Sequence, residues 1–246
     1  MNIRLGHVLA RAEPGHAVAA LHFSVPGPVV ADILRVFAAD WEFAARERLE
    51  GEAWLPPATS AKAGDTLARI VTDGPDEDIG KLRWTLLGAI SVAKESVRIL
   101  TPYFVPDQAL IDSLALAALR GIRVEIVLPE HNNVFLVQWA SSALLWQLLE
   151  RGCRVYATPP PFDHSKLFLV DDRWALVGSA NWDARSLRLN FEVGLELDDP
   201  ELLRELDREF ARKRSHAREI TLGAQDGRPL WTRLRDGTAR LFSPYL

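Results

Sequence analysis

The sequence predicts an α/β fold, with a mixed, largely parallel sheet and helices on both of its faces. The first observation is an alternation between residues 66 and 157, where short apolar runs are separated by longer amphipathic segments. The second is the pair Gly121 and Gly152, each of which follows a helical pattern and precedes an apolar run. Strands that alternate with helices need crossover connections, which cover the faces of a parallel sheet with helices. Three apolar runs after residue 162 lack helices between them, so we expect antiparallel pairs there.

The same patterns place each element along the chain. Helices are expected at 29–50, 79–95, 107–121, 133–152 and 199–219. Strands are expected at 20–25, 66–72, 96–104, 122–129, 153–157, 164–170, 173–179 and 189–197. A stretch rich in proline, glycine and alanine at 51–65 indicates a linker. We therefore expect three parts: an incomplete N-terminal segment at 1–62, a complete α/β domain at 63–218 and an amphipathic tail at 219–246.

Composition limits the classes of function. The 246 residues carry a formal net charge of -4 and the sequence pI is about 5.9, so no basic field favours a nucleic acid as partner. The single cysteine, Cys153, is consistent with a reducing compartment. No apolar run approaches the roughly 20 residues that a membrane-spanning helix needs.

Polar side chains interrupt the apolar runs between residues 162 and 197. His164 and Lys166 lie two positions apart, so in a strand they share one face. A lysine inside a sheet is costly unless a negative charge compensates it, and an anion held between these two side chains would do so. Ser179 and Asn181 follow the next strand and supply further hydrogen-bond donors. An imidazole that attacks phosphorus, an ammonium and two small polar groups together suit a phosphate.

Two carboxylates accompany this group. Glu192 lies in the following apolar run, where we expect it to orient one ring nitrogen of His164. Asp171 ends its strand at a turn, and we expect it to hold the backbone of that loop. Singly, a histidine in a strand or an aspartate at a turn is usually structural. Chance rarely combines His-x-Lys, an aspartate five positions after the lysine and then Gly-Ser-x-Asn, so the joint pattern favours a functional site.

These motifs resemble a known family. "HSKLFLVD" followed by "GSAN" resembles the His-x-Lys-x4-Asp signature of the phospholipase D superfamily, and "TPYFVPDQAL", "SANWDARSLRLNFE" and "RPLWTRLRDGTARLFSPYL" are similar to segments of bacterial cardiolipin synthases. The resemblance implies a phospholipase D-like α-β-α sandwich and a two-step phosphodiester exchange through a phosphohistidine, with no metal or other cofactor. The residues that it identifies as catalytic are His164, Lys166, Asp171, Ser179, Asn181 and Glu192. Tyr103 and Phe104 are expected to line the same cleft and bind substrate, although core positions at a strand end suit them equally well.

One departure from the family pattern bears on function. The family's synthases carry two His-x-Lys motifs, whereas this chain has one, because none of its other histidines has a lysine two positions later. Residues 1–62 accordingly resemble the remnant of a first phospholipase D-like half. Three interpretations follow: a cardiolipin synthase-like phosphatidyltransferase that takes its second motif from a homodimer or a missing N-terminal half, a single-motif phosphodiesterase or nuclease, and an inactive truncated fragment that only binds lipid or a partner.

The expected partners follow from the first interpretation. The resemblance implies a phospholipid substrate such as phosphatidylglycerol, and no nucleic acid is favoured. The tail mixes apolar residues with arginines, namely Leu230, Trp231, Leu234, Leu241 and Phe242 with Arg228, Arg233, Arg235 and Arg240. This mixture suits either an amphipathic segment on an anionic membrane surface or a terminal helix that packs on its own domain. We expect a cytoplasmic protein that is peripheral to the inner membrane.

Overall fold

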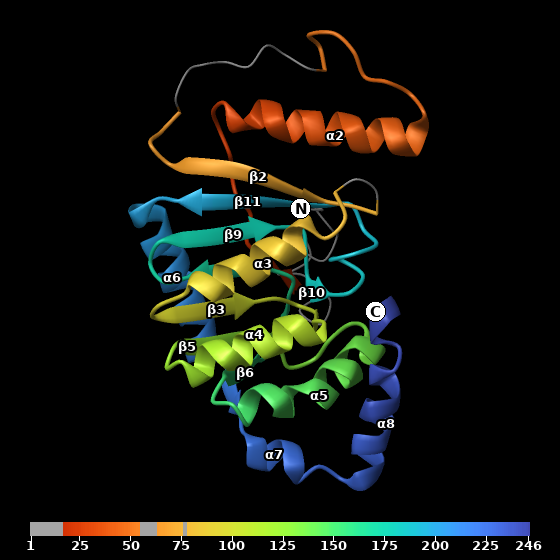
Figure 1. Cartoon of the computed structure of the whole chain (residues 1–246), viewed down its shortest axis with the longest axis vertical. Helices are drawn as coiled ribbons and strands as arrows, with labels where there is room; N and C mark the ends of the chain where they lie inside the picture. The colour runs from red at the N-terminus through yellow and green to blue at the C-terminus, as the bar shows by residue number, and fades with distance from the viewer. Residues whose placement is uncertain (1–16, 55–62, 76–77) are drawn as a thin grey trace.

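A computed structural model describes residues 17–54, 63–75 and 78–246, and within them an eight-stranded sheet has the order β12-β6-β5-β3-β8-β9-β11-β2 (Figure 1). Its strands are β2 (Leu67–Asp73), β3 (Ser96–Leu100), β5 (Arg123–Pro129), β6 (Arg154–Thr158), β8 (Leu167–Val170), β9 (Trp174–Gly178), β11 (Glu192–Asp198) and β12 (Arg218–Ile220). Two short parallel pairs lie outside this sheet, and they are β1 (Val18–Ala19) with β7 (Phe162–Asp163) and β4 (Phe104–Val105) with β10 (Trp182–Asp183).

The sheet is mixed, as predicted, but the prediction that it is largely parallel is wrong. Among the described strands, β3–β5 and β5–β6 pair in parallel, and the other five pairs of the large sheet are antiparallel. The connections explain the difference. The segments that join β8 to β9 and β9 to β11 contain no helix, and the chain reverses direction at each of them.

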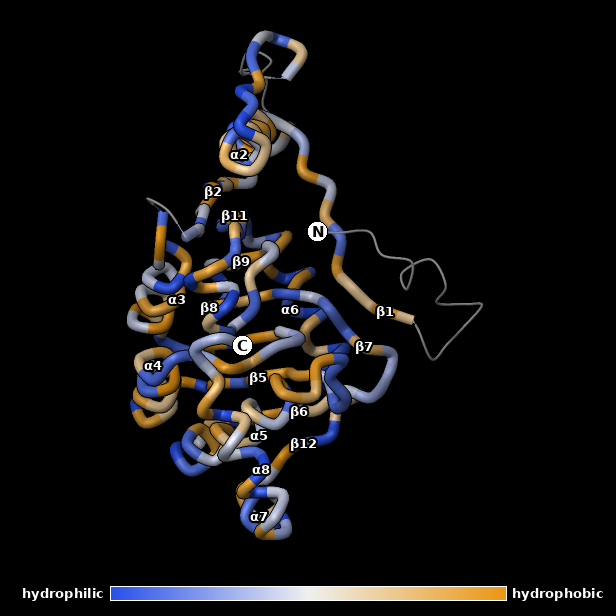
Figure 2. Tube along the Cα trace, turned by 90° about the vertical axis from the view of Figure 1, so that its right-hand side faces the viewer, coloured by the Kyte–Doolittle hydropathy of each residue, from blue (hydrophilic) through white to orange (hydrophobic). Residues whose placement is uncertain are grey.

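Helices cover both faces of the sheet, as predicted (Figures 1 and 2). One face carries α3 (Lys81–Val92), α4 (Gln108–Leu119) and α5 (Phe135–Leu149), and the other carries α6 (Pro200–Ser215). Successive strand residues point to opposite faces, so Ile99 joins the core beneath α3, α4 and α5, whereas Leu100 packs with Phe210 of α6. The sheet is therefore buried between two apolar cores, and polar groups are carried at its ends.

The N-terminal part forms less sheet than predicted. The prediction of a strand at 20–25 is wrong, because among the described residues the pairing with β7 ends at Ala19 and the next bond runs from Leu21 N to Ser165 Oγ at 2.9 Å. Helix α2 (Val29–Ala45) lies beside the edge strand β2 and ends at Arg46, whose φ of 57° is left-handed. Residues 1–16 and 55–62 of the predicted N-terminal part lie outside the described residues.

The C-terminal tail packs on its own domain. Helix α7 (Leu222–Asp226) and helix α8 (Leu230–Arg240) follow β12, and α8 lies along α5 (Figure 1). Asp236 is 1% exposed and pairs with Arg228 at 2.6 Å and with Arg235 at 2.7 Å, which anchors α8. Of the helices that the structure describes, none is both long and apolar enough to cross a bilayer.

Candidate active site

Strand ends bring six of the eight predicted residues to one edge of the sheet. Leu100 pairs with Leu167 and Gly178 pairs with Gly194, so the chain leaves β3 and β9 and enters β8 and β11 at the same edge. A cavity of about 570 Å³ opens there. The predicted residues that line it are Tyr103, His164, Lys166, Ser179, Asn181 and Glu192.

His164 and Lys166 form the centre of this site. The Nζ of Lys166 lies 3.1 Å from Nδ1 and 3.3 Å from Nε2 of His164, and it donates to the carbonyl oxygen of His164 at 3.0 Å. The two residues are neighbours, as predicted, but they lie in the connection between β7 and β8 rather than inside a strand. The amide of His164 donates to Ala19 O at 2.7 Å, which fixes this connection against β1. Lys166 is only 7% exposed, so its ammonium needs compensation by an anion or by hydrogen bonds.

Ser179 and Glu192 face each other across the ends of β9 and β11. Ser179 Oγ donates to the carboxylate of Glu192, accepts from Val193 N at 3.0 Å, and so links the two strands. Asn190 Nδ2 donates to the same carboxylate at 3.1 Å, and Glu192 is 8% exposed. These contacts hold a buried negative charge in the cavity wall.

Gly178 permits this close approach. A Cβ at residue 178 would lie 2.9 Å from the Cα of Gly194 on the neighbouring strand, closer than a Cβ normally comes to any atom. Glycine is therefore required at the first position of Gly-Ser-x-Asn by the spacing of β9 and β11.

The loop after Ser179 contributes Asn181 and a carboxylate that the sequence analysis missed. Asn181 Nδ2 donates to Ser186 Oγ at 3.1 Å, whereas its buried Oδ1 has no hydrogen-bond partner among the described residues. Asp183 lines the same cavity, is 3% exposed, and accepts from Ser186 N at 2.7 Å. Its signal was a carboxylate two positions after Asn181 in "SANWDARS", in a segment whose pairing with β4 the pattern did not indicate.

Burial raises the pKa of Asp183 to about 6, and the nearby charge of Glu192 acts in the same direction. The hydrogen bonds from Ser186 and the charge of Lys166 oppose the rise. The cavity therefore holds a carboxyl group that changes its protonation state close to neutral pH, beside an ammonium and an imidazole.

Asp171 lies at the opposite end of β8 from Lys166, and it is not one of the described residues that line the cavity. Its carboxylate accepts from Lys94 N at 3.1 Å, Glu95 N at 2.8 Å and Ser96 N at 2.9 Å. Burial acts to raise the pKa of Asp171, but these backbone hydrogen bonds outweigh it and the pKa lies below its ordinary value. This geometry matches the prediction that Asp171 holds loop backbone.

Tyr103 and Phe104 separate rather than share a cleft. Tyr103 lines the cavity, its ring centroid lies 6.0 Å from that of His164, and its hydroxyl donates to Asn133 Oδ1 at 2.8 Å. Phe104 is 1% exposed, stacks on Trp182 at 6.1 Å and lines a second cavity. The prediction that Phe104 lines the same cleft is therefore wrong, because adjacent residues of an extended segment point in opposite directions.

The arrangement suits nucleophilic attack on a phosphorus atom. It places an imidazole, which can act as a nucleophile, beside an ammonium that could balance charge on phosphoryl oxygens, and hydroxyl and amide groups line the same cavity. Among the described residues, no group of three or more histidine, cysteine, aspartate or glutamate side chains gathers in a metal-binding arrangement.

Solved structures of the phospholipase D class share this fold. The phosphatidylserine synthase of Haemophilus influenzae superposes with a TM-score of 0.66 at 17% identity, over 88% of this chain and 62% of that chain. Nuc from Salmonella typhimurium, a phospholipase D family member, gives 0.55 at 21% identity, over 64% of this chain and 99% of that chain. The fold is therefore the phospholipase D-like α-β-α sandwich that the sequence predicted.

Sequence comparison places the chain in one family within this class of proteins. Residues 86–214 match the profile described as "Cardiolipin synthase, PLD-like domain", and the chain belongs to that family. It is similar to the major cardiolipin synthase ClsA of Bacillus subtilis, with 36% identity over 228 residues, which cover 92% of this chain and 47% of that protein. The chain thus spans about half the length of the curated relatives that it matches.

Proposed function

We propose that this chain is a cardiolipin synthase-like phosphatidyltransferase that moves a phosphatidyl group between alcohols through a phosphohistidine on His164. The observation that carries the proposal is the contact of Lys166 Nζ with the ring of His164, 3.1 Å from Nδ1, at the wall of the cavity that Ser179 and Asn181 also line. Family membership and relatives named as cardiolipin synthases support it.

The reaction has two balanced steps. In the first, a ring nitrogen of His164 bonds to phosphorus, the bond between phosphorus and the leaving alcohol oxygen breaks, and that oxygen takes up a proton from an acid. In the second, an acceptor hydroxyl loses its proton, its oxygen bonds to phosphorus, and the bond between phosphorus and nitrogen breaks. For a donor such as phosphatidylglycerol the leaving alcohol is glycerol.

Each neighbouring residue has a proposed role in these steps. Lys166 balances the charge of the phosphoryl oxygens, and Ser179 and Asn181 hydrogen-bond to them or to the incoming hydroxyl. Glu192 orients the imidazole of His164, and Asp171 positions the loop at the far end of β8 without touching substrate.

The acid that protonates the leaving alcohol comes, in this proposal, from a second His-x-Lys motif. The chain holds one such motif, so the second belongs to another copy of the domain, in a homodimer or on another segment. Helix α2 carries large apolar side chains that a second copy could cover, because Phe37 is 48%, Trp41 40% and Phe43 51% exposed. Phe43 also contacts Phe191 at a centroid distance of 4.9 Å, and Phe191 lines the catalytic cavity.

A phospholipid substrate implies a membrane surface next to the cavity, and we propose peripheral contact there. Exposed apolar residues lie beside or in the lining, with Phe135 60%, Leu189 52% and Tyr245 74% exposed. Arg185 lines the cavity as well and adds positive charge that attracts anionic lipid. Helix α8 and the residues after it extend the apolar surface, with Trp231 81% and Leu241 77% exposed.

The test is phosphatidyl transfer in vesicles of phosphatidylglycerol, followed by lipid analysis and by capture of a phosphorylated protein. The wild type forms a two-phosphate lipid and releases glycerol, and His164→Asn lowers this by roughly a thousandfold or more, since the nucleophile is lost. His216→Asn, at an exposed position that does not line the cavity, is the matched control and keeps full activity. A folded wild type that forms no such lipid contradicts the transferase, and hydrolysis of single-stranded DNA in its place favours the nuclease interpretation.

Mixing experiments test the second copy. If two copies share one active centre, equal amounts of wild type and His164→Asn, fully exchanged, give about one quarter of the wild-type activity rather than one half. A value near one half shows that each chain acts alone.

A further inference from the structure

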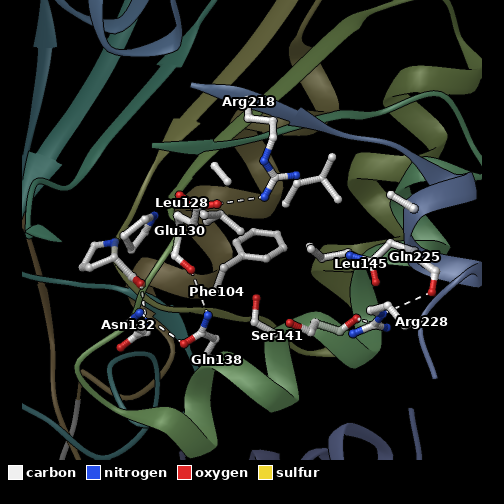
Figure 3. Close-up of a pocket in the computed structure, with 16 residues that line it drawn as sticks. Phe104, Leu128, Glu130, Asn132, Gln138, Ser141, Leu145, Arg218, Gln225 and Arg228 are labelled. Atoms are coloured by element: carbon white, nitrogen blue, oxygen red, sulfur yellow. Dashed lines mark hydrogen bonds and ion pairs between the residues drawn. The ribbon is translucent and has the colours of Figure 1, made fainter. Parts of the chain in front are cut away.

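A second cavity (Figure 3) is lined by Pro102 and Phe104, whereas Tyr103 between them lines the catalytic cavity. It has a volume of about 240 Å³ and lies between β5, β6, α5, β12 and α7. The apolar residues that line it include Phe104, Leu128, Leu145, Ala157 and Ile220. The polar residues include Glu130, Ser141, Ser142, Arg218, Gln225 and Arg228. No step of the proposed reaction uses this cavity.

Gln225 gives this cavity a binding requirement. It lines the cavity, is 7% exposed, and its Oε1 has no hydrogen-bond partner among the described residues. A buried amide oxygen left unpaired destabilises the folded chain, so it favours a ligand that can donate a hydrogen bond. By contrast, the amide of Gln138 in the same lining is used, because it accepts from Asn132 N at 3.3 Å and donates to Glu130 O at 2.9 Å.

The charges around the cavity compensate one another. Arg218 pairs with Glu130 at 3.0 Å (Figure 3), and Arg228 pairs with the buried Asp236 at 2.6 Å. Glu130 and Asp236 already balance the charges of the two guanidiniums, so no unbalanced positive charge is left to attract a phosphate or carboxylate, and an anion is disfavoured. A hydrocarbon is disfavoured as well, because it offers no donor to Gln225.

We propose that this cavity is a binding site for a small neutral polyol, of a size between glycerol and a monosaccharide. Each hydroxyl of a polyol both donates and accepts, and the site offers both functions. Gln225 Oε1 and the carboxylate of Glu130 accept, whereas Arg218 donates. The carbon face of the ligand lies against Phe104 and Leu145. The volume is far larger than one water needs, since a water takes about 30 Å³ of liquid.

This site has a direct connection to the catalytic loop. Phe104 forms its wall and stacks on Trp182, which lies between Asn181 and Asp183 and pairs with Phe104 in the β4–β10 ladder. A ligand that packs against Phe104 therefore stabilises the β4–β10 pair, which holds Asn181 and Asp183 at the catalytic cavity.

The experiment is a direct binding measurement on the full chain by ligand-observed saturation-transfer NMR and calorimetry. Glycerol and glucose bind, whereas inorganic phosphate and hexanol at the same concentrations do not compete. Gln225→Met weakens polyol binding by at least about fivefold, because the amide oxygen that accepts from the ligand hydroxyl is lost. Arg218→Met weakens polyol binding as well, and because the Arg218 side chain is 63% exposed, its replacement leaves the fold intact. Gln147→Met, on α5 outside both linings, is the matched control and binds as the wild type does.

A further variant separates the two cavities. His164→Asn is expected to bind polyol with unchanged affinity, so binding survives even if the proposed transferase reaction fails. The proposal is overturned if the wild type binds neither polyol, if folded Gln225→Met and Arg218→Met both bind them as tightly as the wild type, if phosphate displaces them, or if His164→Asn abolishes the binding.

Discussion

Asp183→Asn tests whether the catalytic cavity holds a carboxyl that resists ionisation. Burial, helped by the charge of Glu192, raises the pKa of Asp183 from its ordinary 3.8 to about 6. Asparagine keeps an oxygen that accepts from Ser186 N but carries no charge at any pH. The substitution therefore removes the titration and leaves the turn intact.

The sign of the pH dependence of the free energy of unfolding follows from which state, folded or unfolded, ionises at the lower pH. Between pH 4 and 6 the unfolded chain releases the proton of Asp183 while the folded chain keeps it, so the free energy of unfolding of the wild type falls as pH rises through this window. The shift is about 2 pH units at about 1.4 kcal/mol each, or about 3 kcal/mol in total. Below about pH 3 and above about pH 7 the contribution of this group is constant.

The assay is urea unfolding of both proteins from pH 4 to pH 8, read as the difference in free energy of unfolding. All other titrating groups cancel in this difference, apart from those coupled to residue 183. The stability of Asp183→Asn relative to the wild type should rise by about 2–3 kcal/mol between pH 4 and pH 7. A difference that stays flat across this range shows that Asp183 ionises normally, and the reasoning from burial is then refuted.

Substitutions at Gly178 and Asp171 test how the strands around the site are held in place. Gly178→Ala forces a Cβ against the backbone of β11 and should lower the free energy of unfolding, measured in urea, by about 3 kcal/mol. The control is Gly237→Ala on α8, where open space surrounds the new Cβ, and it should leave the free energy of unfolding unchanged or raise it slightly. Equal effects of the two substitutions contradict the close packing at Gly178. Asp171→Ala removes the acceptor of three backbone amides and should cost about 3 kcal/mol, with Asp171→Asn costing less because asparagine still accepts and tolerates the φ of 51°; if Ala and Asn are equally stable, the carboxylate does not hold that loop.

Local patterns were enough to predict most helices and the composition of the site. Helices α3, α4, α5 and α6 have interior sequences whose apolar spacing is visible without tertiary contacts, and Asp107 caps α4 by accepting from Leu110 N, as a helix start pattern indicates. The motif residues are recognisable because His164 and Lys166 are costly in an apolar run unless something compensates them. Their convergence on one cavity then follows from short connections between neighbouring strands.

The direction of the sheet and the second cavity depend on contacts that no local pattern encodes. An apolar run has the same appearance in a parallel or an antiparallel pair, so the pairing of β2 with β11 at the far edge had no signal in the sequence. Phe104 faces away from Tyr103 because β4 pairs with β10, a contact between segments almost eighty positions apart. Gln225 lies in a tail whose apolar residues suited a membrane surface equally well, and only the packing of α7 and α8 shows that it lines a cavity.

The spacing of the motif has a structural explanation that joins these two levels. Between Lys166 and Asp171 lies β8, Leu167–Val170, so the four intervening residues are the whole length of this strand. Lys166 reaches the catalytic cavity at one end, and Asp171 binds the amides that enter β3 at the other. Inserting one residue into β8 would turn the side chains on one side of the insertion to the opposite face of the sheet. The spacing of the motif therefore matches the length of β8, and in the proposed reaction the placing of His164 and Lys166 depends on a carboxylate at the far end of that strand.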